Sequence, residues 1–293
     1  VSRFYFPIAV IPLSRTFFHT FFADMHGFFA NLPRRRVDKA AALCYTFRKN
    51  GAAGRIFPPT PGPPEKRAFA YRSGGTMGYL AEFLYIGAAV GLLAFLGRRF
   101  SLPRDVTRKL THILMCFVYV PEYLFFRDRW QSLVVPVIVT LLLFFTARYA
   151  LVPSMVNPET PYGIFFYAVA VTAVMALSLL FPAFLLPAGA AIFCLSFGDG
   201  FAALLGGFVK RPHRLIGKKS VEGCFFCFAF SLVGLLILGL LIPEAMLTFP
   251  AALITAAVAT VLELVGGRFD NLLISFGVLF TVRLLAALGV AYA

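Results

Sequence analysis

Long apolar runs recur between residues 79 and 291, and they constrain the fold more than any other feature of the chain. Each run has roughly 17–22 residues, the length that an α-helix needs to cross about 30 Å of hydrocarbon. The runs are continuous rather than alternating, which favours helices over the strands of a membrane barrel. Sixty per cent of the residues are hydrophobic and 14% are charged, against about 25% charged in soluble domains. A chain with this composition must have much of its apolar surface in contact with lipid.

The runs predict eight helices, over residues 79–97, 109–126, 132–149, 163–181, 184–208, 221–242, 245–264 and 271–291. Since only helices and closed barrels satisfy their backbone groups inside a bilayer, the predicted fold class is all-α, a polytopic transmembrane helix bundle of about 7–8 spans. We expect residues 77–293 to form this transmembrane catalytic domain.

Residues 1–76 differ from the rest of the chain. They hold 12 Lys and Arg against 3 acidic residues, so they supply +9 of the net charge of +14. The arginine run 34–36 and the proline-rich stretch 58–64 are typical of disordered or linker sequence. One hypothesis is that Met77 is the natural start and that 1–76 is a non-native extension. The alternative is a basic arm that binds the membrane surface or targets the protein.

Basic residues cluster in two of the predicted loops, after the first and the fifth helix. These loops contain Arg98, Arg99, Arg104, Arg108 and Lys109, and Lys210, Arg211, Arg214, Lys218 and Lys219. Eight helices put both loops on one side, which the positive-inside rule makes cytoplasmic. Arg127 and Arg129 fall on the opposite side. No nucleic-acid-binding motif accompanies the charge, so the basic residues are attributed to orientation and phosphate binding in an integral membrane protein.

Asp199 stands inside the fifth apolar run, between Gly198 and Gly200. Ionisable groups in a membrane segment are costly and are functional candidates by default. Glycines allow backbone or ligand to approach closely, and a carboxylate there suits Mg²⁺, which takes one or two carboxylates together with substrate phosphates. The alternative is a glycine packing face with one paired acid.

A second polar motif, residues 217–223, opens the sixth helix. Ser220 is a plausible N-cap, and a helix N-terminus with free N–H groups attracts anions. Lys218 and Lys219 add charge suited to a polyphosphate, between Gly217 and Gly223. The motif lacks the spacing of a Walker loop. An anchor for membrane orientation would explain the lysines but not Glu222.

Two further groups fall on the same predicted side. Arg108 and Lys109 begin the second helix, with His112 one turn further on; topology signals alone would account for the first two. The last two helices are joined through a segment with Glu263, Arg268, Asp270 and Asn271, which an ordinary cap and surface pair would also explain.

Five cysteines occur mostly within apolar runs, where free cysteine packs as a small hydrophobe. Cys224 and Cys227 form a C-x-x-C pair, but a metal or redox site needs further ligands or a polar setting, and phenylalanines surround the pair.

In this order the four polar motifs resemble those of the polyprenol kinase family, which includes dolichol kinases, phytol kinases and CTP-dependent diacylglycerol kinases. The matching patterns are R-K-x-x-H at 108–112, G-D-x-x-A-x-L-x-G at 198–206, G-K-K-S-x-E-G at 217–223, and Glu263 followed by the D-N pair at 270–271. The central two are the more specific, with Asp199 lying 19 residues before Lys218.

The resemblance implies a kinase that phosphorylates a membrane lipid alcohol with CTP and a divalent cation such as Mg²⁺. It places Asp199, Lys218, Lys219 and Glu222 in catalysis, and Asp199, Asp270 and Asn271 at the metal. Gly198, Gly200, Gly217, Ser220, Gly223, Arg108, Lys109 and His112 would bind the nucleotide and its phosphates. Either Glu222 or Asp199 would orient or deprotonate the lipid hydroxyl, and a polyprenol, a phytol-like isoprenoid or diacylglycerol would fit as substrate.

Two other functions remain open from the sequence. The phosphatidate cytidylyltransferases have a related D-x-x-A and K-x-x-E-G arrangement and would make CDP-lipid. A non-enzymatic membrane transporter would carry broken helices and an internal repeat, with its site near the middle of the bilayer. The sequence has no evident repeat, and its charged groups gather towards one side.

Overall fold

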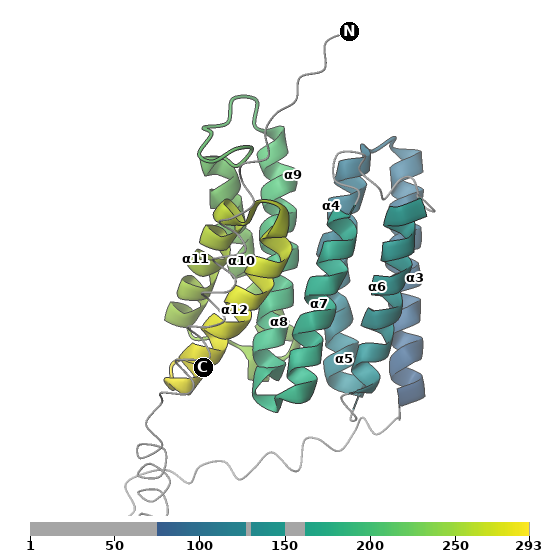
Figure 1. Ribbon diagram of the computed structural model, residues 1–293, viewed down its shortest axis with the longest axis vertical. Helices are drawn as coiled ribbons and strands as arrows, with labels where there is room; N and C mark the ends of the chain where they lie inside the picture. The colour runs from purple at the N-terminus through teal and green to yellow at the C-terminus, as the bar shows by residue number, and fades with distance from the viewer. Residues whose placement is uncertain (1–74, 127–129, 150–161, 293) are drawn as a thin grey trace, which may run out of the picture. The chain divides into compact units, whose positions relative to one another are not determined.

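The computed structural model describes residues 75–126, 130–149 and 162–292 of the chain. Within these ranges the secondary structure is helical, and the β-type pairing consists of two isolated bridges, Arg214 with Ser220 and Leu247 with Tyr292. The predicted all-α bundle is therefore confirmed (Figure 1). Predictions about the basic segment before residue 75, and about Arg127 and Arg129, lie outside the described residues and stay predictions.

Seven helical segments of the described residues are long and apolar enough to cross a membrane, which agrees with the predicted seven or eight spans. Six of them are α3 (Gly75–Arg99), α6 (Val134–Tyr149, continuing the 3₁₀ turn Gln131–Leu133), α7 (Gly163–Leu180), α10 (Val221–Leu241), α11 (Phe249–Gly266) and α12 (Asp270–Ala287). The seventh, Pro182–Phe208, combines α8 (Leu185–Phe193), a π-helical segment (Cys194–Asp199) and α9 (Gly200–Phe208).

The segment Pro182–Phe208 is the central helix of the bundle. The protein buries 83% of its most apolar window, against 17–39% for the other six spans. It carries a run of small buried residues, Ala188, Gly189, Ala190 and Ala191. Small residues let neighbouring helices approach closely, which is the usual basis of helix packing in lipid. The central position of this helix surrounds Asp199 with protein rather than with lipid.

The predicted second span, 109–126, is a broken helix. It consists of α4 (Arg104–Met115), a 3₁₀ turn (Cys116–Val118) and α5 (Tyr119–Phe125). Pro121 has no N–H to donate to the carbonyl of Phe117, and its ring crowds that carbonyl, so the chain tightens just before the proline. Together α4 and α5 run from one end of the bundle to the other (Figure 1).

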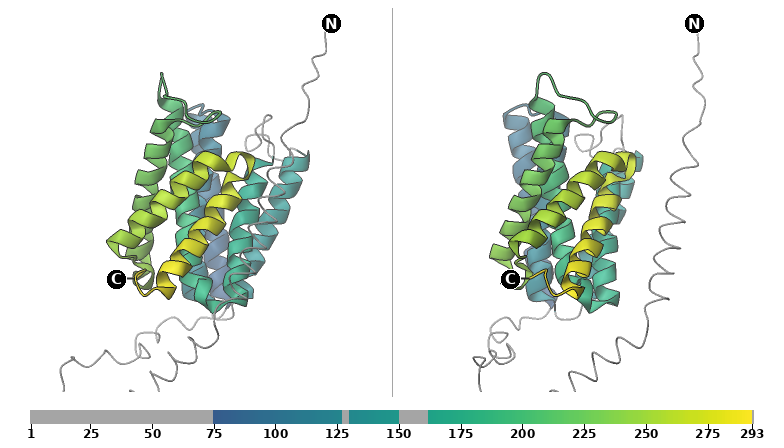
Figure 2. Two further views of the ribbon diagram at one scale, coloured as in Figure 1. Left: turned by 60° about the vertical axis from the view of Figure 1, so that its left-hand side comes forward. Right: turned by 90° about the vertical axis from the view of Figure 1, so that its left-hand side faces the viewer.

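The α3–α4 and α9–α10 connections lie at the same end of the bundle, as the positive loops predicted (Figure 1). Beside the central helix, α11 and α12 pack side by side in an antiparallel pair (Figure 2). The buried face of α12 carries Ile274, Val278, Leu279 and Val282, at the helical spacing of one apolar stripe. This packing brings the start of α12 close to the α9–α10 connection, where the polar motifs converge.

Candidate functional site

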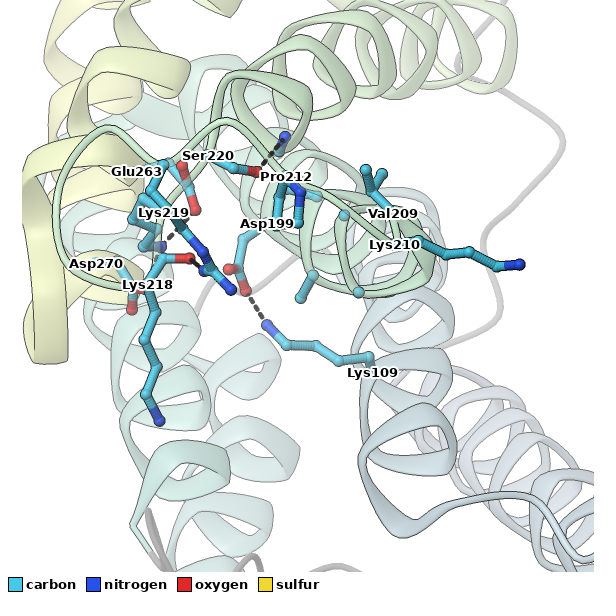
Figure 3. Close-up of a pocket in the computed structure, with 16 residues that line it drawn as sticks. Lys109, Asp199, Val209, Lys210, Pro212, Lys218, Lys219, Ser220, Glu263 and Asp270 are labelled. Carbon is cyan, nitrogen blue, oxygen red and sulfur yellow. Dashed lines mark hydrogen bonds and ion pairs between the residues drawn. The ribbon is translucent and has the colours of Figure 1, made fainter.

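A cavity of about 470 Å³ opens among the polar motifs, at the end of the bundle that holds the α9–α10 connection. Figure 3 shows its lining side chains. They are Lys109, Asp199, Ala202, Ala203, Gly206, Gly207, Val209, Lys210, Pro212, Arg214, Lys218, Lys219, Ser220, Gly223, Glu263 and Asp270. Segments far apart in the sequence thus build one site.

Asp199 ends the π-helical segment of the central helix, and only 4% of the residue is exposed. A π-helical turn interrupts the regular α-helical bonding, and such turns are frequent at functional sites. Lys109 of α4 reaches across the cavity to this carboxylate, with Nζ 2.5 Å from Oδ2 (Figure 3). Burying a carboxylate without a partner is energetically costly. The ion pair with Lys109 offsets the cost of burying the charged Asp199 side chain.

Lys219 binds two further carboxylates of the cavity wall. Its ammonium forms ion pairs with Glu263 at the end of α11 and with Asp270 at the start of α12, where Nζ lies 3.2 Å from Oδ2. Burial acts to lower the pKa of Lys219, but Asp270 and Glu263 outweigh it and raise that pKa well above its ordinary value. Lys219 therefore stays charged and ties α11 and α12 to the connection before α10.

The α9–α10 connection folds as a short hairpin. The N–H of Val221 donates to the carbonyl of His213 at 3.0 Å, and that of Leu215 donates to Lys219 at 2.9 Å. Gly217 turns the chain with φ +56°, a conformation that favours glycine. Ser220 then caps α10, because its hydroxyl accepts the N–H of Gly223 at 3.2 Å. Lys210, Arg214 and Lys218 from this connection all line the cavity.

The cavity combines five basic side chains with three carboxylates, so its formal charge is +2. One wall consists of small residues, Ala202, Ala203, Gly206 and Gly207, which leave room beside the charges. Excess positive charge with carboxylates inside it suits a polyphosphate that arrives with a divalent cation.

Within the described ranges, no three His, Cys, Asp or Glu side chains are grouped closely enough to hold a metal ion by themselves. Mg²⁺ needs fewer protein ligands, since it is commonly held by one or two carboxylates plus substrate phosphates. Asp199 and Asp270 line the same cavity, and they fit a cation bound with its substrate better than a permanently bound one. Cys224 and Cys227 are free thiols.

The structure brings together seven of the residues predicted from the sequence as site residues. Those on the cavity wall are Lys109, Asp199, Lys218, Lys219, Ser220, Gly223 and Asp270.

Four predicted residues near the central motifs lie outside the cavity lining. Gly198 and Gly200 pack helices: a Cβ on Gly198 would meet the Ser231 hydroxyl, and one on Gly200 would lie 2.5 Å from Cγ1 of Ile113. Gly217 forms the hairpin turn. Glu222 points to His213, with Oε1 2.6 Å from the ring Nδ1.

Three further predicted residues surround the site without lining it. Arg108 pairs with Asp105 at 3.6 Å, and His112 is buried with its ring edge against Tyr167. Asn271 donates its backbone N–H to Oδ1 of Asp270 at 2.9 Å, so it orients that carboxylate.

Several cavity residues were given no role by the sequence. Glu263 was noted as an acid near the D-N pair, and Lys210 and Arg214 only as part of a positive loop. A buried acid at the end of an apolar helix is a recognisable signal for Glu263. For Lys210 and Arg214 the deciding feature is the hairpin, which has no strong sequence signature.

A scan against models of known protein families found no match to this chain, and searches of curated proteins and of solved structures found none either. The resemblance to the polyprenol kinases therefore rests on the motifs themselves, and the seven apolar helices place the chain among integral membrane proteins.

Proposed function

We propose that this chain is a phosphotransferase of the polyprenol kinase type, which transfers the terminal phosphoryl group of CTP to the hydroxyl of a membrane lipid alcohol. The observation that carries the proposal is the joint placement of Asp199, Lys219 and Asp270 on one cavity with an excess of positive charge. Phosphoryl transfer depends mainly on positioning and on charge stabilisation, which this set of side chains can supply.

The basic side chains give the triphosphate its binding site. Lys218 and Lys219 precede the capped N-terminus of α10, where the helix dipole adds to their charge. Lys109 approaches from α4 on the opposite wall. A divalent cation bound with the triphosphate would be held by Asp199 and Asp270 and would neutralise phosphate charge.

The transfer step forms a bond between the lipid oxygen and the γ-phosphorus and breaks the bond from that phosphorus to the β–γ bridging oxygen, so CDP leaves. The hydroxyl proton must pass to a base. Of the two acids considered from the sequence, Asp199 lines the cavity, whereas Glu222 is engaged with His213 outside it. We therefore assign to the Asp199 carboxylate both the orientation of the lipid hydroxyl and the acceptance of its proton.

The membrane setting supports a lipid acceptor. Phe208 of α9 and Phe225 of α10, which are close in sequence to the cavity residues Gly207 and Gly223, are 72% and 64% exposed. Apolar groups of this kind stay in contact with lipid. A primary hydroxyl at headgroup depth would therefore reach the cavity from the bilayer, while the nucleotide comes from the aqueous side, which we take to be cytoplasmic.

The test is a transfer assay with the purified full chain in detergent micelles. The protein is incubated with γ-labelled CTP, Mg²⁺ and a panel of lipid alcohols containing a polyprenol, phytol and diacylglycerol, and the label is followed into the organic phase. The proposal expects labelled lipid phosphate and CDP in equal amounts. Organic-phase label from one alcohol also identifies the acceptor.

The nearest competing function is measured in the same assay. A phosphatidate cytidylyltransferase attacks the α-phosphate, so it would release pyrophosphate and form CDP-lipid when phosphatidate is supplied. Pyrophosphate release without labelled lipid would replace the kinase proposal with this one.

A further inference from the structure

Glu222, in the first turn of α10, is bound by a single residue of the α9–α10 connection. Its Oε2 accepts the backbone N–H of His213 at 3.1 Å, and its Oε1 lies 2.6 Å from Nδ1 of the same residue. The side chain of Glu222 is 24% exposed and does not line the cavity. Both carboxylate oxygens of Glu222 therefore bind one residue of the connection, and we call this pair of contacts the Glu222–His213 clamp.

The clamped segment supplies much of the positive charge of the cavity. Arg214 follows His213 on the first arm of the hairpin, Lys218 lies in its turn, and Lys210 precedes the hairpin. The His213 side chain is 82% exposed, so burial contributes little to holding the hairpin in place. Segments with few buried contacts open readily, and the position of the Arg214 and Lys218 side chains then depends on specific bonds.

Glu222 is well suited to provide such bonds. A carboxylate in the first turn of a helix is stabilised by the helix dipole, and α10 itself is anchored in the bundle by its packing against α9 and α11. The clamp therefore joins the exposed hairpin to a rigid element beside the cavity.

We propose that Glu222 is a positioning residue: through His213 it holds the α9–α10 hairpin so that Arg214 and Lys218 face the phosphates of the nucleotide. The inference rests on the proposed function for the identity of the ligand. It assigns Glu222 to nucleotide affinity and removes it from proton transfer.

The kinetic test compares Glu222→Ala with Glu222→Gln. The Gln carbonyl can still accept the His213 N–H, but it cannot take a proton. A positioning role predicts a KM for CTP raised about tenfold in the Ala variant and only about threefold in the Gln variant, with kcat within about twofold of wild type. A general base would lose about 10²–10⁴-fold in kcat in both variants, and that result would overturn the inference.

The clamp also predicts non-additivity. His213→Ala removes the ring contact, so adding it to Glu222→Ala should raise KM by less than about twofold beyond the single Ala variant. Independent, multiplying effects of the two substitutions would show that they do not act through each other.

A second measurement needs no substrate and separates this inference from the proposed function. Hydrogen–deuterium exchange of the backbone amides of His213 and Val221 is followed in the full chain in micelles. Glu222→Ala should speed exchange at both amides by about tenfold or more, while Glu244→Ala, at an exposed acid outside the cavity, leaves them unchanged. Unchanged exchange in Glu222→Ala would refute the clamp. If the wild type transfers no phosphate to any alcohol, the proposed function fails, and the exchange result still decides whether Glu222 positions the hairpin.

Discussion

Lys109 and Asp199 form an ion pair at 2.5 Å across 90 residues of sequence, and this pair joins the broken helix α4–α5 to the central helix. Both side chains are largely buried, with exposed fractions of 12% and 6%. Since a buried carboxylate without a partner is strongly unfavourable, the two residues depend on each other for stability. They also lie on the cavity that we propose as the nucleotide site.

Replacing Asp199 with Asn should abolish transfer while the protein still folds. The substitution keeps the shape of the side chain but removes the charge that would hold the cation and orient the lipid hydroxyl, so we expect a loss of at least about 10²-fold in kcat. The labelled-CTP assay measures it. The control is Asp105→Asn, which changes a 65% exposed acid outside the cavity lining and should keep wild-type activity. Substantial turnover in Asp199→Asn would refute the role of this carboxylate.

The energetic coupling between Lys109 and Asp199 can be measured with a double-mutant cycle. Lys109→Met leaves the carboxylate of Asp199 buried without its nearest cation, so we expect a loss of about 3 kcal/mol in stability. Adding Asp199→Asn should restore part of that loss, because the uncompensated charge is gone. Thermal unfolding of the four proteins in one detergent gives the coupling. Strictly additive shifts in Tm would show that the pair contributes nothing as a pair.

The raised pKa of Lys219 predicts how the stability of the fold depends on pH in alkaline solution. A lysine whose pKa is higher in the folded state stabilises the fold fully below its unfolded value of about 10.4, and loses that contribution only as the pH rises through the folded value. Lys219 is 24% exposed, so we expect Lys219→Met to cost roughly 2 kcal/mol, somewhat less than a fully buried pair.

The difference in thermal stability between wild type and Lys219→Met should therefore stay constant from about pH 7 to about pH 9.5. Lys210→Met, on the same cavity wall, is the control and should change Tm little over this range. A wild-type advantage that fades between these pH values would mean that the carboxylates do not hold the proton on Lys219.

Substitutions at two glycines of α9 test whether Gly200 allows α9 to pack closely against α4. A Cβ at Gly200 would lie 2.5 Å from Cγ1 of Ile113 in α4, whereas a Cβ at Gly207 meets nothing within 4 Å. Gly200→Ala should cost about 1–3 kcal/mol by forcing the two helices apart. Gly207→Ala should be neutral or slightly stabilising, because alanine favours the helix. Equal Tm values for the two variants would contradict the packing assignment.

The sequence alone determined the membrane architecture. Runs of apolar residues long enough to cross a bilayer leave few alternatives to helices, and the described spans agree with the predicted ones to within a few residues at most ends. It also identified Asp199, Lys219 and Asp270, because a charged side chain at the membrane edge is costly and so stands out.

The tertiary structure decided what those residues face. Sequence distance says nothing about whether Lys109 reaches Asp199, or whether Glu222 turns to the cavity or to His213; helix packing and the hairpin fix both. Composition could not indicate which span is central either, since Pro182–Phe208 is less apolar than Val221–Leu241 yet far more buried. In lipid, burial inside the protein depends on small residues that let helices meet, and hydrophobicity alone does not separate the protein interior from the bilayer.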